Sequence, residues 1–279
     1  MPNLPKNVNS KIIIECKRRR LSPRTCKTYL SCIQRFLNWS KKDLRYISKK
    51  DVRLFLEYLS EKDMAGSTMN VYHMALRFLF ENVLEKRMWI DIKYSKTPKR
   101  LPEVLSKEEV KKLIDSIKNF KHQLMVCFLY SSGLRVSELI NLKIKDLEID
   151  KKYGYVRNGK GGKDRLITIA ENLIPAIKRL IKNENLDKKD YLFRSNRGTK
   201  YSMKSIQKIV ENASRIAKID KQVHPHTLRH SFATHLIENG YDVTNVQALL
   251  GHKSPETTLI YTHIASPNLI NVQSPLEKL

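Results

Sequence analysis

Residues 224–235 read HPHTLRHSFATH, and we begin with the helix that this stretch predicts over about residues 226–238. His226 and Arg229 are three residues apart and therefore share one helical face. Four histidines in the stretch suggest a metal site, but it contains no Asp, no Glu and no HExxH pattern, and metal sites usually recruit carboxylates or cysteines. We therefore predict that His226 and Arg229 bind an anion, and that His230 and His235 are structural.

Two further stretches contain candidate site residues. In SSGLRVSEL, residues 131–139, Arg135 lies between apolar neighbours at a glycine-broken helix junction. Its guanidinium can bind a phosphate through two hydrogen bonds, with Glu138 to orient it; an ordinary Arg–Glu helix pair is the alternative. In LLGHKSPETTLIYTH, residues 249–263, His252 follows a helix-ending glycine and Tyr261 lies in the next predicted helix. Taken alone, Tyr261 is an ordinary packing residue.

Together with Lys163 of the turn GKGGKDR, these residues supply every part of a metal-free phosphoryl-transfer site. Two arginines can neutralise charge on the non-bridging phosphate oxygens. Histidines can hydrogen-bond the same oxygens or accept a phenol proton near pH 7. A tyrosine can attack as the nucleophile, and a lysine can give a proton to the departing alkoxide. The candidate catalytic residues are Arg135, Lys163, His226, Arg229, His252 and Tyr261.

The charge of the chain favours a polyanionic partner. Its 279 residues include 53 Lys and Arg against 28 Asp and Glu, a formal net charge of +25. Residues 1–100 carry +14 of this charge and residues 101–279 carry +11. Because both parts are basic, we expect two domains that grip a long polyanion from two sides, whereas a single basic tail would load one end.

Composition also indicates the cellular compartment in which the protein functions. A hydrophobic fraction of 41% is enough for packed cores, and no apolar run approaches the length of about 18 residues that spans a bilayer. The amino terminus, MPNLPKNVNSK, has no apolar segment of a signal peptide, so we predict a cytoplasmic protein with no membrane association. The cysteines are irregularly spaced and form no CxxC pair, which favours reduced packing thiols over zinc or disulfide frameworks. They are Cys16, Cys26, Cys32 and Cys127.

Residues 1–94 predict an all-α bundle. Ser22 followed by Pro23 is a helix start, and Ser48 with Asp51 resembles a capping box. A further apolar stripe runs from Val71 to Val83, and no strand pattern competes. After this segment, residues 95–102 predict an extended basic linker, because they are rich in proline and basic residues and almost free of apolar ones.

Residues 103–265 predict a mainly helical domain with a small sheet. Ser106 with Glu109 forms a capping box that opens a helix, a second helix covers about residues 121–131, and a third begins near Val136. Residues 153–157 and 164–170 are strand-like and flank the glycine-rich turn NGKGGK, which predicts a β-hairpin. The remaining predicted helices cover about residues 172–182, 203–217, 226–238, 243–250 and 255–263.

In combination the motifs resemble the tyrosine recombinases, or phage integrase family. The matching stretches are GLRVSEL, GKGGKDR, HPHTLRHSFATHL and LLGHKSPETTLIYTH, in the family's order. The resemblance covers about residues 103–265, which would form the catalytic domain, and the helices of residues 1–94 look like the family's SAM-like core-binding domain. It implies the tyrosine recombinase fold, with residues 266–279 as a tail that contacts a neighbouring subunit; a frayed terminus is the alternative.

The resemblance also implies a mechanism. Arg135, Lys163, His226, Arg229 and His252 would surround the scissile phosphate, with Tyr261 as the nucleophile. Attack would leave a 3′-phosphotyrosyl link and a free 5′-hydroxyl, and the 5′-hydroxyl of a partner DNA would reverse the step. The covalent link conserves the energy of the phosphodiester, so no cofactor or metal is expected, in agreement with a sequence that contains no P-loop and no clustered-carboxylate Mg²⁺ pattern.

Within the family, a chain of two domains looks most like the Xer type, which resolves chromosome or plasmid dimers at a dif-like site. The implied partners are double-stranded DNA with a short inverted-repeat site and three further copies of the chain in a tetramer. We expect the two basic domains to clamp the duplex, using Lys17–Arg20, Arg24, Lys41, Lys42 and the linker. A mobile-element or phage integrase, a type IB topoisomerase and a non-catalytic DNA-binding protein are the alternatives.

Overall fold

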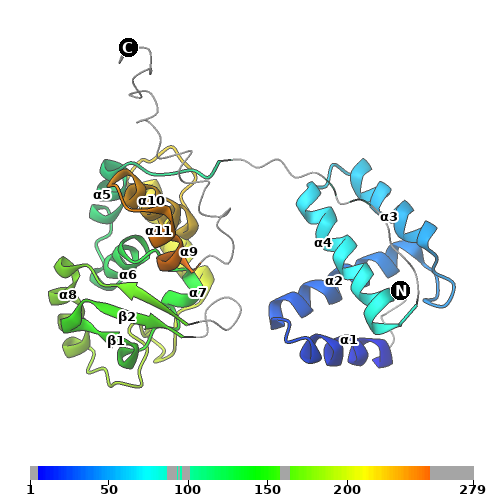
Figure 1. Ribbon diagram of the computed structural model, residues 1–279, viewed down its shortest axis with the longest axis horizontal. Helices are drawn as coiled ribbons and strands as arrows, with labels where there is room; N and C mark the ends of the chain where they lie inside the picture. Colours follow the sequence, from blue (N-terminus) through cyan, green and yellow to red (C-terminus); the bar gives the residue numbers. More distant parts are fainter. Residues whose placement is uncertain (1–5, 87–92, 94, 96–100, 158–163, 252–279) are drawn as a thin grey trace, which may run out of the picture. The chain divides into compact units, whose positions relative to one another are not determined.

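The structure is a computed structural model that describes residues 6–86, 93, 95, 101–157 and 164–251. The chain divides into two compact units, Met1–Arg100 and Leu101–Leu279 (Figure 1). The mainly helical fold expected from the sequence is confirmed, with a small antiparallel sheet in the second unit. Within the described ranges, we find no helix with the length and apolar character needed to cross a membrane.

The first unit is a helical bundle. Its elements are α1 (Lys6–Arg18), α2 (Pro23–Ser40), α3 (Lys49–Glu61), α4 (Gly66–Arg77) and the π-helical turn η1 (Phe78–Val83) that continues α4. The helix α1 was not predicted as a separate element. This helix buries Val8, Ile12 and Cys16 but leaves Ile14 exposed, so its apolar residues do not form the single clean stripe by which a surface helix is recognised.

Both helix starts predicted in this unit are present. The Ser22 hydroxyl accepts a hydrogen bond from the Thr25 N–H at 3.0 Å, with Pro23 in the first turn of α2. At the start of α3, the Ser48 hydroxyl accepts from the Asp51 N–H and the Asp51 carboxylate accepts from the Ser48 N–H. Each cap satisfies backbone donors that the first turn of a helix leaves unpaired.

Aromatic rings form the centre of the first unit. Phe36 and Phe55, from α2 and α3, are fully buried and meet edge to face with ring centroids 5.1 Å apart. Phe80 of η1 lies perpendicular to Phe36, with a centroid distance of 6.3 Å. Such pairs stabilise a core beyond the burial of their surface, and here they join α2, α3 and η1.

The second unit begins with three helices. They are α5 (Lys107–Asp115), α6 (Phe120–Ser131) and the short α7 (Val136–Leu139). The predicted capping box of Ser106 and Glu109 opens α5. The helices after the sheet are α8 (Ile174–Asn183), α9 (Met203–Ile216), α10 (Pro225–Glu238) and α11 (Val243–Leu250). Short 3₁₀ turns, η2 (Ile144–Asp146), η3 (Ile149–Lys151) and η4 (Glu171–Leu173), flank the strands.

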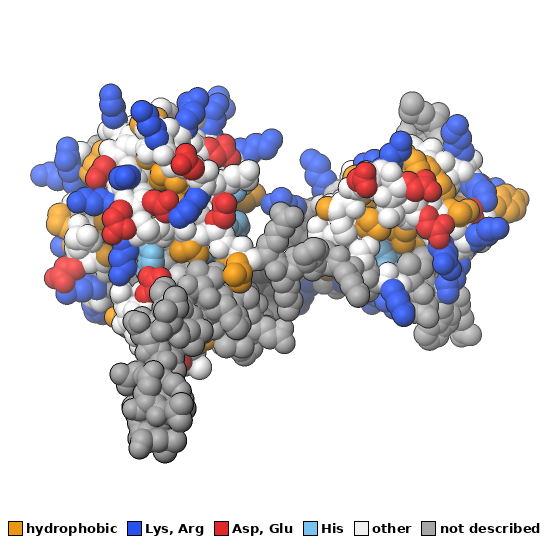
Figure 2. Space-filling model, turned by 90° about the horizontal axis from the view of Figure 1, so that it is seen from above, with side chains coloured by type: hydrophobic (Ala, Val, Ile, Leu, Met, Phe, Trp, Pro, Cys, Tyr) orange, Lys and Arg blue, Asp and Glu red, His pale blue; other side chains and the backbone are white. Residues whose placement is uncertain are grey.

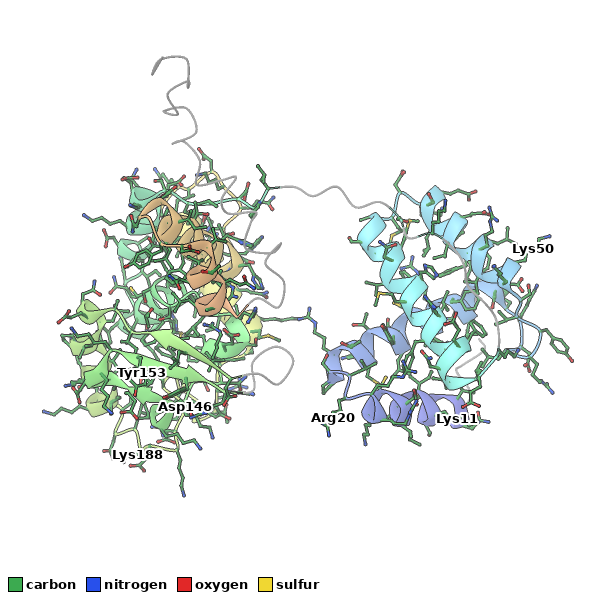
Figure 3. The ribbon with its side chains drawn as sticks, in the orientation of Figure 1. Lys11, Arg20, Lys50, Asp146, Tyr153 and Lys188 are labelled. Atoms are coloured by element: carbon green, nitrogen blue, oxygen red, sulfur yellow. The ribbon has the colours of Figure 1, made fainter. Side chains whose placement is uncertain are left out.

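The sheet has three antiparallel strands in the order β1 (Leu147–Glu148), β2 (Tyr153–Val156) and β3 (Arg165–Thr168). The hairpin of β2 and β3 is as predicted, and the intervening turn of residues 158–163 lies outside the described residues. The two-residue strand β1 was not predicted. It lies close to Gly154 of β2, where an added Cβ would come within 2.8 Å of the Leu147 side chain. Figure 3 labels Tyr153, at the start of β2, and Asp146 beside it.

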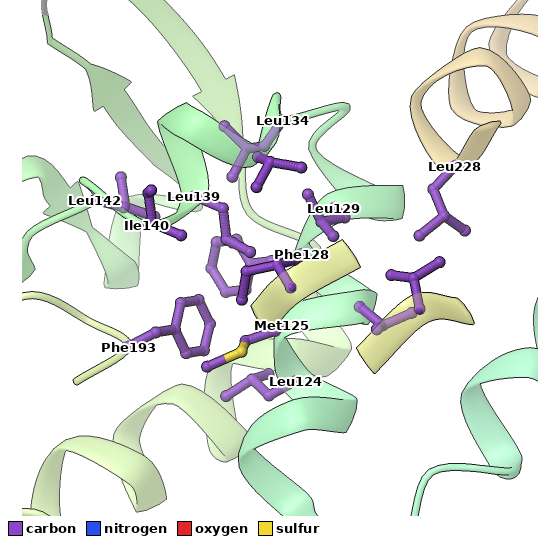
Figure 4. Close-up of a cluster of buried hydrophobic side chains, with 14 of the residues drawn as sticks. Leu124, Met125, Phe128, Leu129, Leu134, Leu139, Ile140, Leu142, Phe193 and Leu228 are labelled. Carbon is purple, nitrogen blue, oxygen red and sulfur yellow. The ribbon is translucent and has the colours of Figure 1, made fainter. Parts of the chain in front are cut away.

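The core of the second unit surrounds α6. This helix buries Leu124, Met125, Phe128 and Leu129, and none of its residues is exposed. In Figure 4 these side chains lie between Phe193 on one side and Leu228 of α10 on the other. A helix with no exposed face must be covered on all sides, and α10 supplies part of that cover.

Candidate active site

Glu138 of α7 is the centre of a cluster of arginines. Its Oε1 accepts a hydrogen bond from Nη1 of Arg135 at 2.6 Å, and its Oε2 accepts from the backbone N–H of Arg135 at 2.9 Å. Arg135 is the N-cap of α7, so the carboxylate holds both its side chain and the start of its helix. The guanidinium of Arg135 stays partly accessible, with 18% of the side chain exposed, against 4% for Glu138.

Arg165, the first residue of β3, binds the same carboxylate. Its Nη2 donates to Oε2 of Glu138 at 2.6 Å, and its Nη1 donates to the carbonyl oxygen of Leu249 in the last turn of α11. We assigned no role to Arg165 from the sequence. The alternation of side chains along β3 offered a signal for this role, because Arg165 lies on the same face of the strand as the buried Ile167. An arginine on an inward face needs an acidic partner.

Arg229 enters the cluster from α10. It is 3% exposed, and its Nη1 lies 3.9 Å from Oε2 of Glu138. Nη1 also donates to the carbonyl oxygen of Gly133, and Nη2 donates to that of Leu250, both at 2.5 Å. Gly133 precedes Arg135 by two residues, so one guanidinium connects the Arg135 segment with the end of α11.

The cluster carries an excess of positive charge. Burial by itself would raise the pKa of Glu138, but the charge of Arg165 and hydrogen bonds from Arg135 and Arg165 outweigh it and hold that pKa below its usual value. Glu138 is therefore ionised and contributes one negative charge against three guanidinium groups. These four side chains together carry a net charge of +2, and a net positive charge in a buried place favours a bound anion.

His226 lies beside this cluster in the first turn of α10. Partial removal of the imidazole from water lowers its pKa, because the charged form loses hydration. The positive charges of Arg229 and Arg135 lower the pKa further. His226 is thus neutral at pH 7 and offers one ring nitrogen as donor and the other as acceptor. Arg135, His226 and Arg229 are therefore brought together, as an anion site requires.

His230 and His235 are packed into the unit, as the sequence predicted. The ring of His235 is hydrogen-bonded through Nδ1 to the Tyr130 hydroxyl at 2.8 Å. Burial, with the nearby His226 and Arg229, lowers the pKa of His230 to about 4. In the described part of the chain no three His, Cys, Asp or Glu side chains gather as a set that could hold a metal ion, and the four cysteines are free thiols.

The remaining predicted residues, Lys163, His252 and Tyr261, lie outside the described residues. In the sequence, Lys163 stands two residues before Arg165, and His252 directly follows Gly251, the C-cap of α11. Gly251 has a φ of +62°, and an added Cβ there would come within 2.8 Å of Cδ of Arg165. A glycine is therefore required where the chain leaves α11.

Comparisons with known proteins identify the family of this chain. The model of the phage integrase family matches residues 103–267, and that of the phage integrase N-terminal SAM-like domain matches residues 10–90. The chain belongs to the phage integrase family. As a member it is a tyrosine-type site-specific DNA recombinase, the enzyme class for which its relatives are named.

Two relatives and one solved structure illustrate the membership. Tyrosine recombinase XerA of Pyrococcus furiosus is 42% identical over 79% of this integrase-family chain and 78% of its own length. The putative integrase/recombinase y4qK of Sinorhizobium fredii is 32% identical, over 94% of this chain and 85% of its own. The post-cleavage complex of XerH site-specific recombinase bound to palindromic difH substrate is 26% identical, with a TM-score of 0.74, covering 96% of this chain and 85% of that one.

Proposed function

We propose that this recombinase cuts and rejoins DNA through a 3′-phosphotyrosyl link to Tyr261. The observation that carries the proposal is the arginine cluster in the second unit, where Arg135 and Arg229 share one carboxylate, that of Glu138, with Arg165. A scissile phosphate supplies the negative charge that this cluster lacks. As the transferring phosphorus becomes pentacoordinate, preorganised guanidinium groups stabilise the charge that develops on its oxygens.

Each predicted residue has a role in this reaction. The Tyr261 oxygen attacks the phosphorus, the bond to the 5′ oxygen breaks, and Lys163 gives that oxygen a proton. Arg135 and Arg229 bind the non-bridging oxygens, and His226 and His252 hydrogen-bond them or accept the phenol proton. The 5′-hydroxyl of a second strand then attacks the phosphotyrosine and releases Tyr261. Neither step consumes a cofactor, because the phosphotyrosyl bond conserves the energy of the phosphodiester.

The substrate we propose is double-stranded DNA with a short inverted-repeat site. The described residues of both units contribute basic surface: on the face shown in Figure 2, Lys and Arg side chains project from each unit. In the first unit Lys11 is part of α1, Arg20 follows that helix, and Lys50 is in the first turn of α3 (Figure 3). Binding of this kind is dominated by phosphate contacts and weakens as salt rises.

Among family activities, we propose the Xer type: resolution of chromosome or plasmid dimers at a dif-like site by a tetramer on DNA, in the cytoplasm, with residues 266–279 contacting a neighbouring subunit. The similarity to XerA and the structural likeness to XerH bound to difH support this proposal. The similarity to a putative integrase/recombinase favours a second candidate, the integrase of a mobile element.

The nucleophile is tested with a nicked suicide substrate. We expect the wild-type chain to form an adduct with DNA that resists SDS, and Tyr261→Phe to bind the same DNA without forming it, because the variant lacks the attacking oxygen. Tyr241→Phe, at an exposed tyrosine before α11, is the matched control and should form the adduct normally. An adduct in Tyr261→Phe would overturn the proposal, and no adduct in the wild type would favour a non-catalytic DNA-binding protein.

The alternative functions are distinguished by the DNA on which the chain acts and by the reaction that it performs. Sequencing the DNA trapped on the wild-type chain should give one short inverted-repeat site per replicon for a Xer-type enzyme, and element ends for a mobile-element integrase. A type IB topoisomerase would instead relax a supercoiled plasmid as a monomer without a paired site.

A further inference from the structure

We infer that Arg165 is a positioning residue for the recombination reaction, holding Glu138 so that it aims Arg135 and holding the end of α11 in place. The inference rests on the proposed function, because it concerns residues placed there at the scissile phosphate. It adds to the cluster a residue that does not itself touch the substrate.

Arg165 is placed to act within the protein. Its side chain is 9% exposed, half the exposed fraction of Arg135. Both terminal nitrogens are engaged, Nη2 by Glu138 and Nη1 by the carbonyl of Leu249. A guanidinium used in this way fixes the orientation of both its partners.

The first consequence concerns the two oxygens of Glu138. Arg165 occupies Oε2 and leaves Oε1 to Nη1 of Arg135, so each oxygen has its own guanidinium at 2.6 Å. Without Arg165, the side-chain cation left near Oε2 is Arg229, at 3.9 Å. We expect Glu138 to turn toward it, which would release Arg135 from its orientation and draw Arg229 from its carbonyl partners.

The second consequence concerns the carboxyl end of α11. Arg165 binds the carbonyl of Leu249 and Arg229 binds that of Leu250, so two arginines from different elements hold consecutive carbonyls. Cations are stabilising at this end of a helix, where carbonyls are unpaired and the dipole is negative. Cδ of Arg165 also lies close to Gly251, so a larger residue at the C-cap of α11 would displace the Arg165 side chain.

Only arginine has the shape for both contacts. Its planar fork directs two nitrogens to two acceptors at once, whereas a lysine at this position keeps the charge but has one nitrogen. Arg165→Lys should therefore fold and remain partly active, and Arg165→Met should lose both contacts while keeping most of the packing volume. The matched control is Arg179→Met, an exposed arginine of α8 whose guanidinium lies over the Phe120 ring.

The test compares cleavage rate with DNA affinity and thermal stability in the full chain. We expect Arg165→Met to bind DNA as the wild type does but to form the phosphotyrosyl adduct about 10- to 100-fold more slowly in single turnover, as for other residues that orient a functional group. Arg165→Lys should lie between the two, and Arg179→Met should match the wild type. A wild-type rate for Arg165→Met, or equal losses of rate and affinity, would overturn the inference.

A double-mutant cycle separates positioning from a general loss of stability. If Arg165 acts through Arg135, then Arg165→Met should slow cleavage much less in an Arg135→Lys background than in the wild type. If the two losses multiply, the inference is wrong. If Arg165→Met does not fold, Arg165→Lys takes its place in the cycle. Tyr261→Phe is assayed alongside and tests the proposed chemistry itself. If the cycle gives multiplied losses while Tyr261→Phe forms no adduct, the result counts against the role of Arg165 alone.

Discussion

Arg229 donates a hydrogen bond from Nη1 to the carbonyl oxygen of Gly133, 2.5 Å away and 96 residues earlier in the chain. The contact joins α10 to the turn that leads into Arg135. Because Arg229 is buried and also binds the carbonyl of Leu250, it has a structural role in addition to the catalytic one we propose. Its loss should therefore affect both stability and reactivity.

We expect Arg229→Lys to lower the single-turnover cleavage rate about 100- to 1,000-fold, because a preorganised charge donor is worth roughly 3–4 kcal/mol in such sites. The variant retains the charge but cannot bind two carbonyls and a phosphate together. Thermal melting should show a lower Tm, and DNA affinity should change little. Cleavage at a wild-type rate would remove Arg229 from the proposed site.

Gly133→Ala should destabilise the second unit by about 1–3 kcal/mol, as an overpacked core substitution does. Gly133 has a φ of +55°, and an added Cβ would come within 2.5 Å of the Phe232 ring. Gly198→Ala is the control, since Gly198 also has a positive φ, +75°, but nothing lies within 4 Å of its added Cβ. Urea unfolding should show a larger loss for Gly133→Ala, and equal losses would mean that Phe232 moves aside freely.

Tyr130→Phe should cost about 1–2 kcal/mol of unfolding free energy, because it leaves the buried His235 without the hydrogen bond at Nδ1. The two rings meet edge to face at 5.8 Å, and phenylalanine preserves that packing. Urea unfolding measures the difference. The exposed Tyr241→Phe should have no effect, and a neutral Tyr130→Phe would show that water replaces the lost partner.

Stability should fall as the pH drops below about 6.5, the usual pKa of histidine. Burial lowers the pKa of His230 to about 4, so the unfolded chain binds a proton there before the folded one does. The stabilising difference is complete above about pH 6.5 and is lost as the pH falls toward 4. In urea unfolding at pH 7.5 and 5, His230→Gln should lose less stability than the wild type, and an unchanged pH dependence would contradict the assignment.

DNA affinity should fall steeply between about 50 and 200 mM salt, as it does when many phosphates are contacted. Arg24 is exposed in the first turn of α2, and Arg24→Ala should reduce the slope of log affinity against log salt by about one. Lys42→Ala should change the slope less, because Nζ of Lys42 lies 2.6 Å from the Asp51 carboxylate. A binding constant nearly independent of salt would exclude the clamp.

Local signals in the sequence determined most of the elements. Capping pairs such as Ser48 with Asp51 and Ser106 with Glu109 form as predicted, because both partners lie within one helical turn. The β2 and β3 hairpin was predictable for the same reason, since its strands adjoin a short glycine-rich turn. The two-residue β1 was not, because a strand of that length has no period of its own and exists only by pairing with β2.

The sequence by itself also determined the types of residue at the site, including Arg135, His226 and Arg229, since the chemistry of a phosphate narrows the side chains that can serve it. Only the tertiary structure decided how they are held. Arg165 meets Glu138 across 27 residues and Leu249 across 84, and no periodicity connects positions so far apart. Such contacts depend on how β3, α7 and α11 pack around the shared core, where the energy of burying each charge selects its partner.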